Sequence, residues 1–141
     1  MTKTAIFTDS ACDIPRTLLE SHGIIIVPLY IIWGDEELRD GQDIDNPTFY
    51  ARLTRDPIHP KTSQPTPTDF ARAVERSGAE QALIITLTSA LSGTHDAAIQ
   101  ARGMIDVPVH VLDSGSLSMG LGWQLLEAAR ERERGGSLEA M

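Results

Sequence analysis

The chain has 141 residues, of which 41% are hydrophobic and 23% are charged, the balance of an ordinary soluble globular domain with a sizeable core. Its formal net charge of −8 at pH 7 argues against a nucleic-acid-binding protein, which would normally present a basic face. The longest apolar run, residues 24–33, is too short to cross a bilayer, so we expect no membrane insertion. Cys12 is the only cysteine, which fits a reducing, cytoplasmic compartment.

Short apolar runs alternate with helical patterns along the chain. Such runs are typical of buried parallel strands, and we expect them at residues 4–8, 24–27, 82–87 and 107–112. Pro28 marks an edge or a bulge after the second run. Residues 29–33 and 36–39 flank Gly34-Asp35 and predict a β-hairpin.

The first half of the chain contains three predicted helices. The first begins near Pro15 and ends at Gly23, with Leu18 and Leu19 facing the sheet. Asn46 is the expected N-cap of a short second helix, because Pro47 follows it and Pro is favoured in the first turn. Its apolar side would consist of Phe49, Tyr50 and Leu53.

A Pro-rich loop at residues 54–65 is expected to lead to the third helix, which opens at Thr66 with Asp69 placed for a capping box. Phe70, Ala73 and Val74 repeat there at helical spacing. Two further helices are expected, at residues 91–105 and from Leu117 to Gly135. Their apolar faces would comprise Leu91, Ala98, Ala101 and Ile105 in one, and Leu117, Leu121, Leu125 and Leu126 in the other. This order predicts an α/β fold: a mostly parallel, Rossmann-like sheet with helices on both faces and a small β-hairpin excursion.

The last residues predict a further element. After Gly135-Gly136, Ser137 resembles the N-cap of a single turn, and one turn does not support itself because helix nucleation is costly. We therefore expect residues 1–136 to form one α/β domain, and residues 137–141 to open a second domain that this sequence does not contain.

Hydroxyl side chains gather directly after the predicted strands. Thr8-Asp9-Ser10 follows the first strand, residues 86–94 after the third are rich in Ser and Thr, and Asp113-Ser114 follows the fourth. In open α/β sheets, ligands bind outside the carboxyl ends of the strands. The pattern predicts a pocket for an acceptor-rich, anionic group.

The segment Ser92-Gly93-Thr94 would open a helix, whose free N–H groups and dipole favour an anion. Ser92 could equally be only an N-cap. Thr62-Ser63 could fold over the same crevice, or could belong to a linker. An ionised Asp9 would repel an anion, so we expect Asp9, Ser10 and Ser114 to support the crevice rather than bind.

Several other sites are disfavoured. The nucleophile elbow Gly-x-Ser-x-Gly and the dinucleotide fingerprint Gly-x-Gly-x-x-Gly are both missing at the required places. The acidic segment at residues 40–45 does not match an EF-hand loop. The four histidines have no metal-ligand spacing, so we expect neither a metal nor a cofactor.

The ordered set of motifs resembles the DegV family of bacterial fatty-acid-binding proteins. The matching segments are Thr8-Asp9-Ser10-Ala11-Cys12-Asp13-Ile14-Pro15, Val27-Pro28-Leu29, Asp40-Gly41, Lys61-Thr62-Ser63-Gln64-Pro65, Leu91-Ser92-Gly93-Thr94 and Val111-Leu112-Asp113-Ser114. Each motif is weak alone, whereas the order is specific and covers nearly the whole chain.

The resemblance implies a binding protein rather than an enzyme. It implies a long-chain fatty acid held between two domains, with its carboxylate bonded by Thr62, Ser63, Ser92, Gly93 and Thr94. It further implies a separate fatty-acid kinase subunit, to which the acid is presented. Since family members usually carry a C-terminal domain that completes the acyl tunnel, we expect this chain alone to retain lipid weakly and to self-associate through an exposed apolar face.

Two other hypotheses remain open. An enzyme that acts on a small acidic or phosphorylated substrate would have a polar pocket in the same crevice without a long apolar channel. A structural or oligomerising fragment would have an interface over the strand ends and no cavity.

Overall fold

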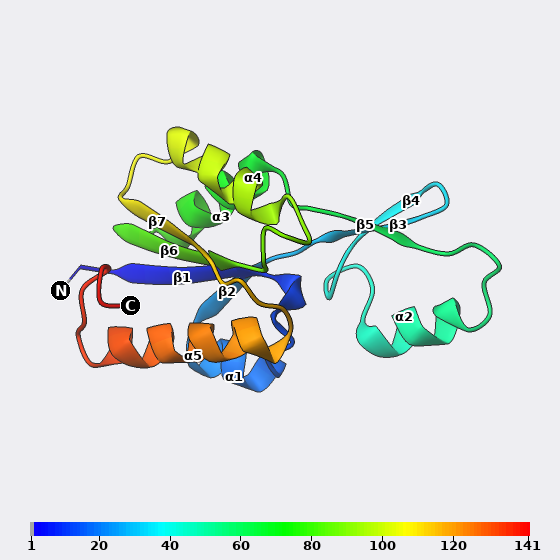
Figure 1. Ribbon diagram of the computed structural model, residues 1–141, viewed down its shortest axis with the longest axis horizontal. Coiled ribbons are helices and arrows are strands. Elements are labelled where there is room, and N and C mark those ends of the chain that lie inside the picture. The colour runs from blue at the N-terminus through cyan, green and yellow to red at the C-terminus, as the bar shows by residue number, and fades with distance from the viewer. Residues whose placement is uncertain (1) are drawn as a thin grey trace.

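A computed structural model of the chain describes residues 2–141 and confirms the α/β architecture. Figure 1 shows a four-stranded parallel sheet with strand order β2-β1-β6-β7. These strands are β1 (Thr4–Asp9), β2 (Ile24–Val27), β6 (Gln81–Thr86) and β7 (Val109–Asp113). Each falls on an apolar run that predicted it. Since β2 is an edge strand, Pro28 follows it without disrupting an inner ladder.

Helices cover both faces of this sheet (Figure 1). On one face lie α1 (Arg16–Ser21) and α5 (Met119–Glu133), and on the other lie α3 (Pro67–Ser77) and α4 (Thr94–Ala101). Short 3-10 turns, η1 (Ser10–Cys12) and η2 (Arg102–Met104), follow β1 and α4. Each face has its own apolar core, the first built around Ile6, Leu83 and Leu121 and the second around Phe7, Phe70 and Ile84.

The prediction that Leu18 and Leu19 both face the sheet is wrong for Leu18. Leu19 is buried, whereas Leu18 is 39% exposed. Neighbouring helical residues point about 100° apart, and α1 turns Leu19 rather than Leu18 toward the core.

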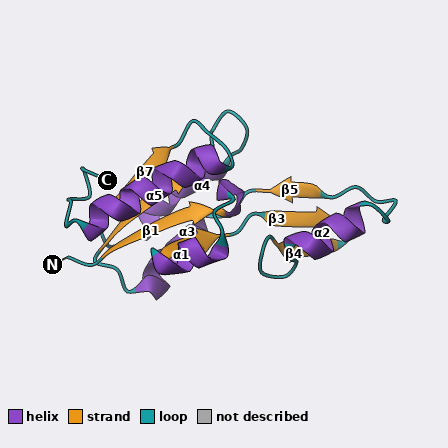
Figure 2. Ribbon diagram, turned by 90° about the horizontal axis from the view of Figure 1, so that it is seen from below, coloured by secondary structure: helices purple, strands orange, loops and turns teal. Residues whose placement is uncertain are grey.

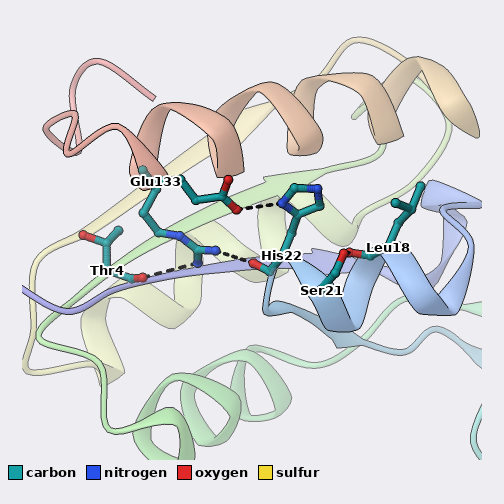
Figure 3. Close-up of polar contacts among 6 residues, drawn as sticks. Thr4, Leu18, Ser21, His22 and Glu133 are labelled. Carbon is teal, nitrogen blue, oxygen red and sulfur yellow. Dashed lines mark hydrogen bonds and ion pairs between the residues drawn. The ribbon is translucent and has the colours of Figure 1, made fainter.

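A group of polar contacts joins the end of α1 to the end of α5, as Figure 3 shows. We call the contacts of His22, Arg132 and Glu133 the polar staple. His22 Nδ1 lies 2.7 Å from Glu133 Oε1. Arg132 donates to the backbone oxygen of His22 and, at 3.5 Å, to that of Thr4. Beside them, the Ser21 hydroxyl donates to the Leu18 oxygen at 3.0 Å. The staple holds two helices and the start of β1 together far from the carboxyl ends of the strands.

The predicted hairpin is confirmed as part of a larger excursion that extends away from the parallel sheet in both ribbon views (Figures 1 and 2). It contains β3 (Tyr30–Trp33), β4 (Glu36–Arg39), α2 (Asn46–Leu53) and β5 (Lys61–Ser63), with sheet order β4-β3-β5. Ile31, Trp33 and Ile44 form its small core, against which Phe49 and Leu53 pack. Tyr50, in contrast, is 62% exposed.

Two details of the excursion differ from prediction. Residues 61–63 pair with β3 as a strand, in place of the loop expected over 54–65. This three-residue strand is polar and exposed, so its own sequence does not distinguish it from a loop. Only its pairing with β3, which is distant in the sequence, identifies it as a strand. The N-cap of α2 is Asp45, whose carboxylate accepts the Thr48 N–H at 2.9 Å, and Asn46 is already helical. The capping box of Thr66 and Asp69 at the start of α3 is confirmed.

The later helices are shorter than predicted. Regular α4 begins at Thr94, so Leu91 lies in the preceding turn and is 70% exposed rather than part of an apolar face. Leu117 precedes α5 and is also exposed. At the end of the chain, the Ala140 N–H bonds to the Ser137 oxygen in a single turn that buries Leu138 in the α1/α5 core. Within residues 2–141, no helix has both the length and the apolar composition needed to cross a membrane.

Candidate functional site

Three neighbouring strands end at the same level of the parallel sheet. Thr86 of β6 pairs with Asp113 of β7, and the pairing of Phe7 with Ile84 puts Asp9 at the level of Thr86. The hydroxyl-rich segments that follow these strands therefore meet at one edge. That edge is where open α/β sheets bind ligands.

Asp9 is fully buried at this edge and bonds only to backbone. Its Oδ1 accepts the Ala11 N–H at 3.0 Å, and its Oδ2 accepts the Leu87 N–H at 2.8 Å. Burial raises the pKa of the Asp9 carboxyl, although these hydrogen bonds oppose the rise. The neighbouring Ser10 Oγ accepts the Leu29 N–H at 3.1 Å. Both side chains connect β1 to the segments beside it.

Asp113 and Ser114 shape the loop that follows β7. Asp113 accepts the N–H groups of Ser89 at 3.2 Å and Gly115 at 2.9 Å. Hydrogen bonding from Ser89 and Gly115 lowers the pKa of the Asp113 carboxyl. Ser114 Oγ donates to the Ser116 oxygen and accepts the Ser116 N–H, at 3.2 and 3.1 Å. These contacts hold the loops after β6 and β7 against each other.

The turn before α4 is organised by its own hydroxyl groups. Ser92 Oγ lies 2.9 Å from Thr94 Oγ1 and accepts the Thr94 N–H at 3.2 Å. Ser92 is half-buried, whereas Thr94 is completely buried. The buried Thr94 hydroxyl therefore does not reach the surface itself, and it contacts the half-buried Ser92 hydroxyl instead.

Gln64 packs directly over Gly93. A Cβ atom placed on Gly93 would lie 2.7 Å from Gln64 Nε2, so a larger residue would force the Gln64 side chain to move. Glycine at this position lets the β5–α3 connection approach the start of α4. The loop containing Thr62-Ser63 and the turn containing Ser92-Gly93 are thus brought together.

A polar cleft of ≈ 380 Å³ lies where these two segments meet. Its lining includes Ser63, Gln64, Gly93, Asp96 and Gln100. We name it the Ser63–Gly93 cleft. Gln64 is not among the site residues predicted from the sequence, although its place within the Thr62–Pro65 motif could have revealed it.

The two hydroxyls of β5 do not point the same way. Thr62 pairs with Ile31 and Ser63 pairs with Tyr30. Because side chains alternate along a strand, Thr62 shares the face of Ile31 and Ser63 shares that of Tyr30. The structure brings Ser63 and Gly93 to one cleft and places Thr62 on the opposite face of β5.

His95 is a further polar residue at this edge that the predicted site did not include. Its Nδ1 lies 3.3 Å from the hydroxyl of Thr86, which is fully buried. Across the described residues 2–141, no three His, Cys, Asp or Glu side chains gather in an arrangement that could hold a metal ion.

Comparison with known proteins gives a consistent picture. A family model described as "Uncharacterised protein, DegV family" matches residues 3–141. A DegV domain-containing protein of Streptomyces coelicolor is 40% identical over an alignment of 139 residues that covers 96% of this chain and 49% of that protein.

Solved structures agree with this match. The structure of DegV from Bacillus subtilis, described as a fatty acid binding protein, has a TM-score of 0.94 and 29% identity, covering 99% of this chain and 51% of its own. The Fatty Acid Kinase (Fak) B3 protein of Streptococcus pneumoniae, loaded with linoleic acid, has a TM-score of 0.83 and 27% identity, covering 99% and 51%. This chain spans about half the length of the relatives it matches. It belongs to the DegV family.

Proposed function

We propose that this chain supplies the carboxylate-binding half of a long-chain fatty-acid-binding protein. The observation that carries the proposal is the contact of Gln64 with Gly93, which joins the Thr62-Ser63 strand to the Ser92–Thr94 turn. The Bacillus relative is described as a fatty acid binding protein and the Streptococcus relative is loaded with linoleic acid, which supports this class of ligand.

The proposed headgroup site combines Ser92, Gly93 and Thr94 with one of the two β5 hydroxyls, Thr62 or Ser63. Hydroxyl groups and a helix N-terminus offer donors to a carboxylate without burying a cation. Thr94 acts by orienting the Ser92 hydroxyl, 2.9 Å away. Strand alternation allows only one of Thr62 and Ser63 to face the carboxylate.

The acyl chain requires more protein than these residues provide. Burial of an acyl chain contributes ~0.8 kcal/mol per CH₂, and the lining of the Ser63–Gly93 cleft is mostly polar. We infer that most of the acyl tunnel belongs to a second domain, comparable to the other half of the relatives. Alone, this chain retains long-chain lipid weakly and self-associates through apolar surface.

The same proposal includes a role in the cell. The protein is a cytoplasmic binding subunit without a cofactor or activity of its own, and it presents the fatty acid to a separate kinase. Support for the kinase comes from the name of the Streptococcus relative.

The headgroup assignment is tested by titrating the 141-residue chain with octanoate, which has a carboxylate but needs little tunnel. Ser92→Ala should weaken octanoate binding at least about fivefold, as expected for one lost hydrogen bond to a charged group. One of Thr62→Val and Ser63→Ala should do the same. Thr17→Val, at an exposed position of α1, is the control and should change nothing. Unchanged affinity in all three site variants would refute the assignment.

The polar lining of the Ser63–Gly93 cleft also favours one alternative, an enzyme that acts on a small acidic or phosphorylated substrate. Comparing octanoate with acetate separates the two functions. A fatty-acid site gains affinity from the longer tail, whereas a site for small acids binds acetate at least as tightly.

A further inference from the structure

A second cleft, of ≈ 330 Å³, lies on the opposite side of α3 from the Ser63–Gly93 cleft. The end of β2, the excursion and α3 form its walls, and Arg39, Arg72 and Arg76 all line it. We name it the arginine cleft. The chain has 12 Lys and Arg against 20 Asp and Glu, so three arginines in one cleft are a local reversal of its charge.

Two acidic side chains beside the arginine cleft, Asp69 and Asp43, already have hydrogen-bond partners. Asp69 Oδ2 accepts from the Thr66 N–H and hydroxyl, each at 2.8 Å, and from the Tyr30 hydroxyl at 3.0 Å. Asp43 accepts the Arg39 backbone N–H, Nε and Nη2 at 2.8 Å. Asp69 and Asp43 are therefore committed to a helix cap and to Arg39.

The other two arginines have no close carboxylate partner, and Arg72 is attracted to the Asp69 carboxylate only through space. None of the ion pairs found within residues 2–141 includes Arg72 or Arg76. They stand four residues apart on α3, where like charges repel each other and destabilise the helix. An anion between them would remove this repulsion.

We propose that the arginine cleft binds a phosphoryl group, with Arg72 and Arg76 as its main ligands. The planar guanidinium forks of arginine match the paired oxygens of a phosphoryl group. On the opposite wall Gln42 adds an amide donor, whereas the charge of Arg39 is already paired with Asp43. This site is separate from the proposed fatty-acid headgroup site and does not depend on it.

Inorganic phosphate is the first probe, titrated into ¹⁵N-labelled chain at constant ionic strength. Saturable shifts are expected at the amides of Arg39, Arg72, Ala73 and Arg76. The double variant Arg72→Gln/Arg76→Gln should weaken phosphate binding at least about tenfold, because two charge-assisted contacts are lost.

The control variant, Arg55→Gln/Arg102→Gln, removes the same charge from two exposed arginines outside the arginine cleft. It should keep wild-type affinity for phosphate. Equal weakening in both double variants would show only diffuse attraction and would overturn the proposal, as would shifts that do not saturate or that lie elsewhere. Both variants replace exposed side chains, and matching circular dichroism melts would confirm that they fold.

Glycerol 3-phosphate is the second probe and distinguishes two sources of the same group. If it binds with the affinity of inorganic phosphate, the site accepts phosphate esters. If only inorganic phosphate binds, free phosphate is the ligand. Either result supports a phosphoryl site, whereas binding of neither probe contradicts it.

Discussion

The carboxylate of Asp9, at the end of β1, accepts the backbone N–H of Leu87, just beyond β6, at 2.8 Å. The same carboxylate accepts the Ala11 N–H at 3.0 Å. One buried side chain thus fixes the relative position of two strand ends and the loops that follow them. We expect the candidate headgroup site to depend on this scaffold, with Asp9 supporting the loops rather than binding the ligand.

Asp9→Ala should destabilise the fold by about 2–4 kcal/mol, because two buried N–H groups lose their acceptor. Asp9→Asn keeps one acceptor oxygen and should lose less. Urea unfolding followed by circular dichroism measures both. Asp106→Ala, at an exposed position, serves as the control. An Asp9→Ala variant as stable as the wild type would show that these bonds contribute nothing.

The staple between His22 and Glu133 predicts a pH effect on stability. The hydrogen bond from His22 lowers the pKa of the Glu133 carboxyl below its usual value. A carboxyl with a lowered pKa stabilises the fold above its unfolded-state pKa, and this contribution is lost as the pH falls through the folded-state pKa. Wild type should therefore exceed Glu133→Gln in stability at pH 6, and the difference should shrink toward pH 3. A difference that grows as the pH falls would contradict this origin.

Gly93→Ala should disturb the candidate site more than the fold. Gly93 has an ordinary φ of −75°, so alanine is not strained there. The three heavy atoms nearest to the new methyl group all belong to the flexible end of Gln64. The unfolding free energy should therefore change by less than about 1 kcal/mol. Octanoate affinity should fall several-fold, because Gln64 is displaced from the Ser63–Gly93 cleft.

Gly103→Ala is the matched control, because a methyl group added at Gly103 would meet no heavy atom within 4 Å. It should leave octanoate affinity unchanged. Equal affinities in the two variants would separate Gly93 from ligand binding.

Asp96→Asn should strengthen octanoate binding. Asp96 lines the Ser63–Gly93 cleft from the first turn of α4 and opposes any bound carboxylate. Removing a nearby like charge at a hydrated surface contributes about 0.5–1 kcal/mol, or roughly a two- to fivefold gain in affinity. Raising the salt concentration should reduce the gain. Weaker binding after Asp96→Asn would mean that the headgroup lies elsewhere.

Local patterns predicted much of this fold. Residues 82–85 are continuously apolar, which is typical of a buried strand. Thr66 and Asp69 form a cap from local chemistry alone. The strand at Lys61–Ser63 escaped prediction because its partner, β3, lies some 30 residues earlier and its own side chains are polar. Leu18 and Leu19 are chemically alike, and only the packing of α1 decides which one is buried.

Prediction of the candidate site was limited in the same way, because the site depends on contacts between segments that are distant in the sequence. The order of the motifs along the chain predicted that Thr62-Ser63 and Ser92-Gly93-Thr94 belong to one site. The structure brings the two segments together. The structure also shows that Thr62 and Ser63 lie in a strand, so their side chains point to opposite faces. In the loop expected from the sequence, both could have pointed the same way. Gln64 lies within the Thr62–Pro65 motif, but its polarity alone does not distinguish a packed amide from a solvated one; its contact with Gly93 does.

The central claim is that a fatty-acid carboxylate binds between the β5–α3 connection and the start of α4. Titration of ¹⁵N-labelled chain with octanoate, read as amide chemical-shift changes, tests it most directly. We predict saturable shifts centred on Ser63, Gln64, Gly93 and Thr94, with tighter binding than for acetate. Shifts centred on another face of the molecule, or the absence of saturable shifts, would contradict it.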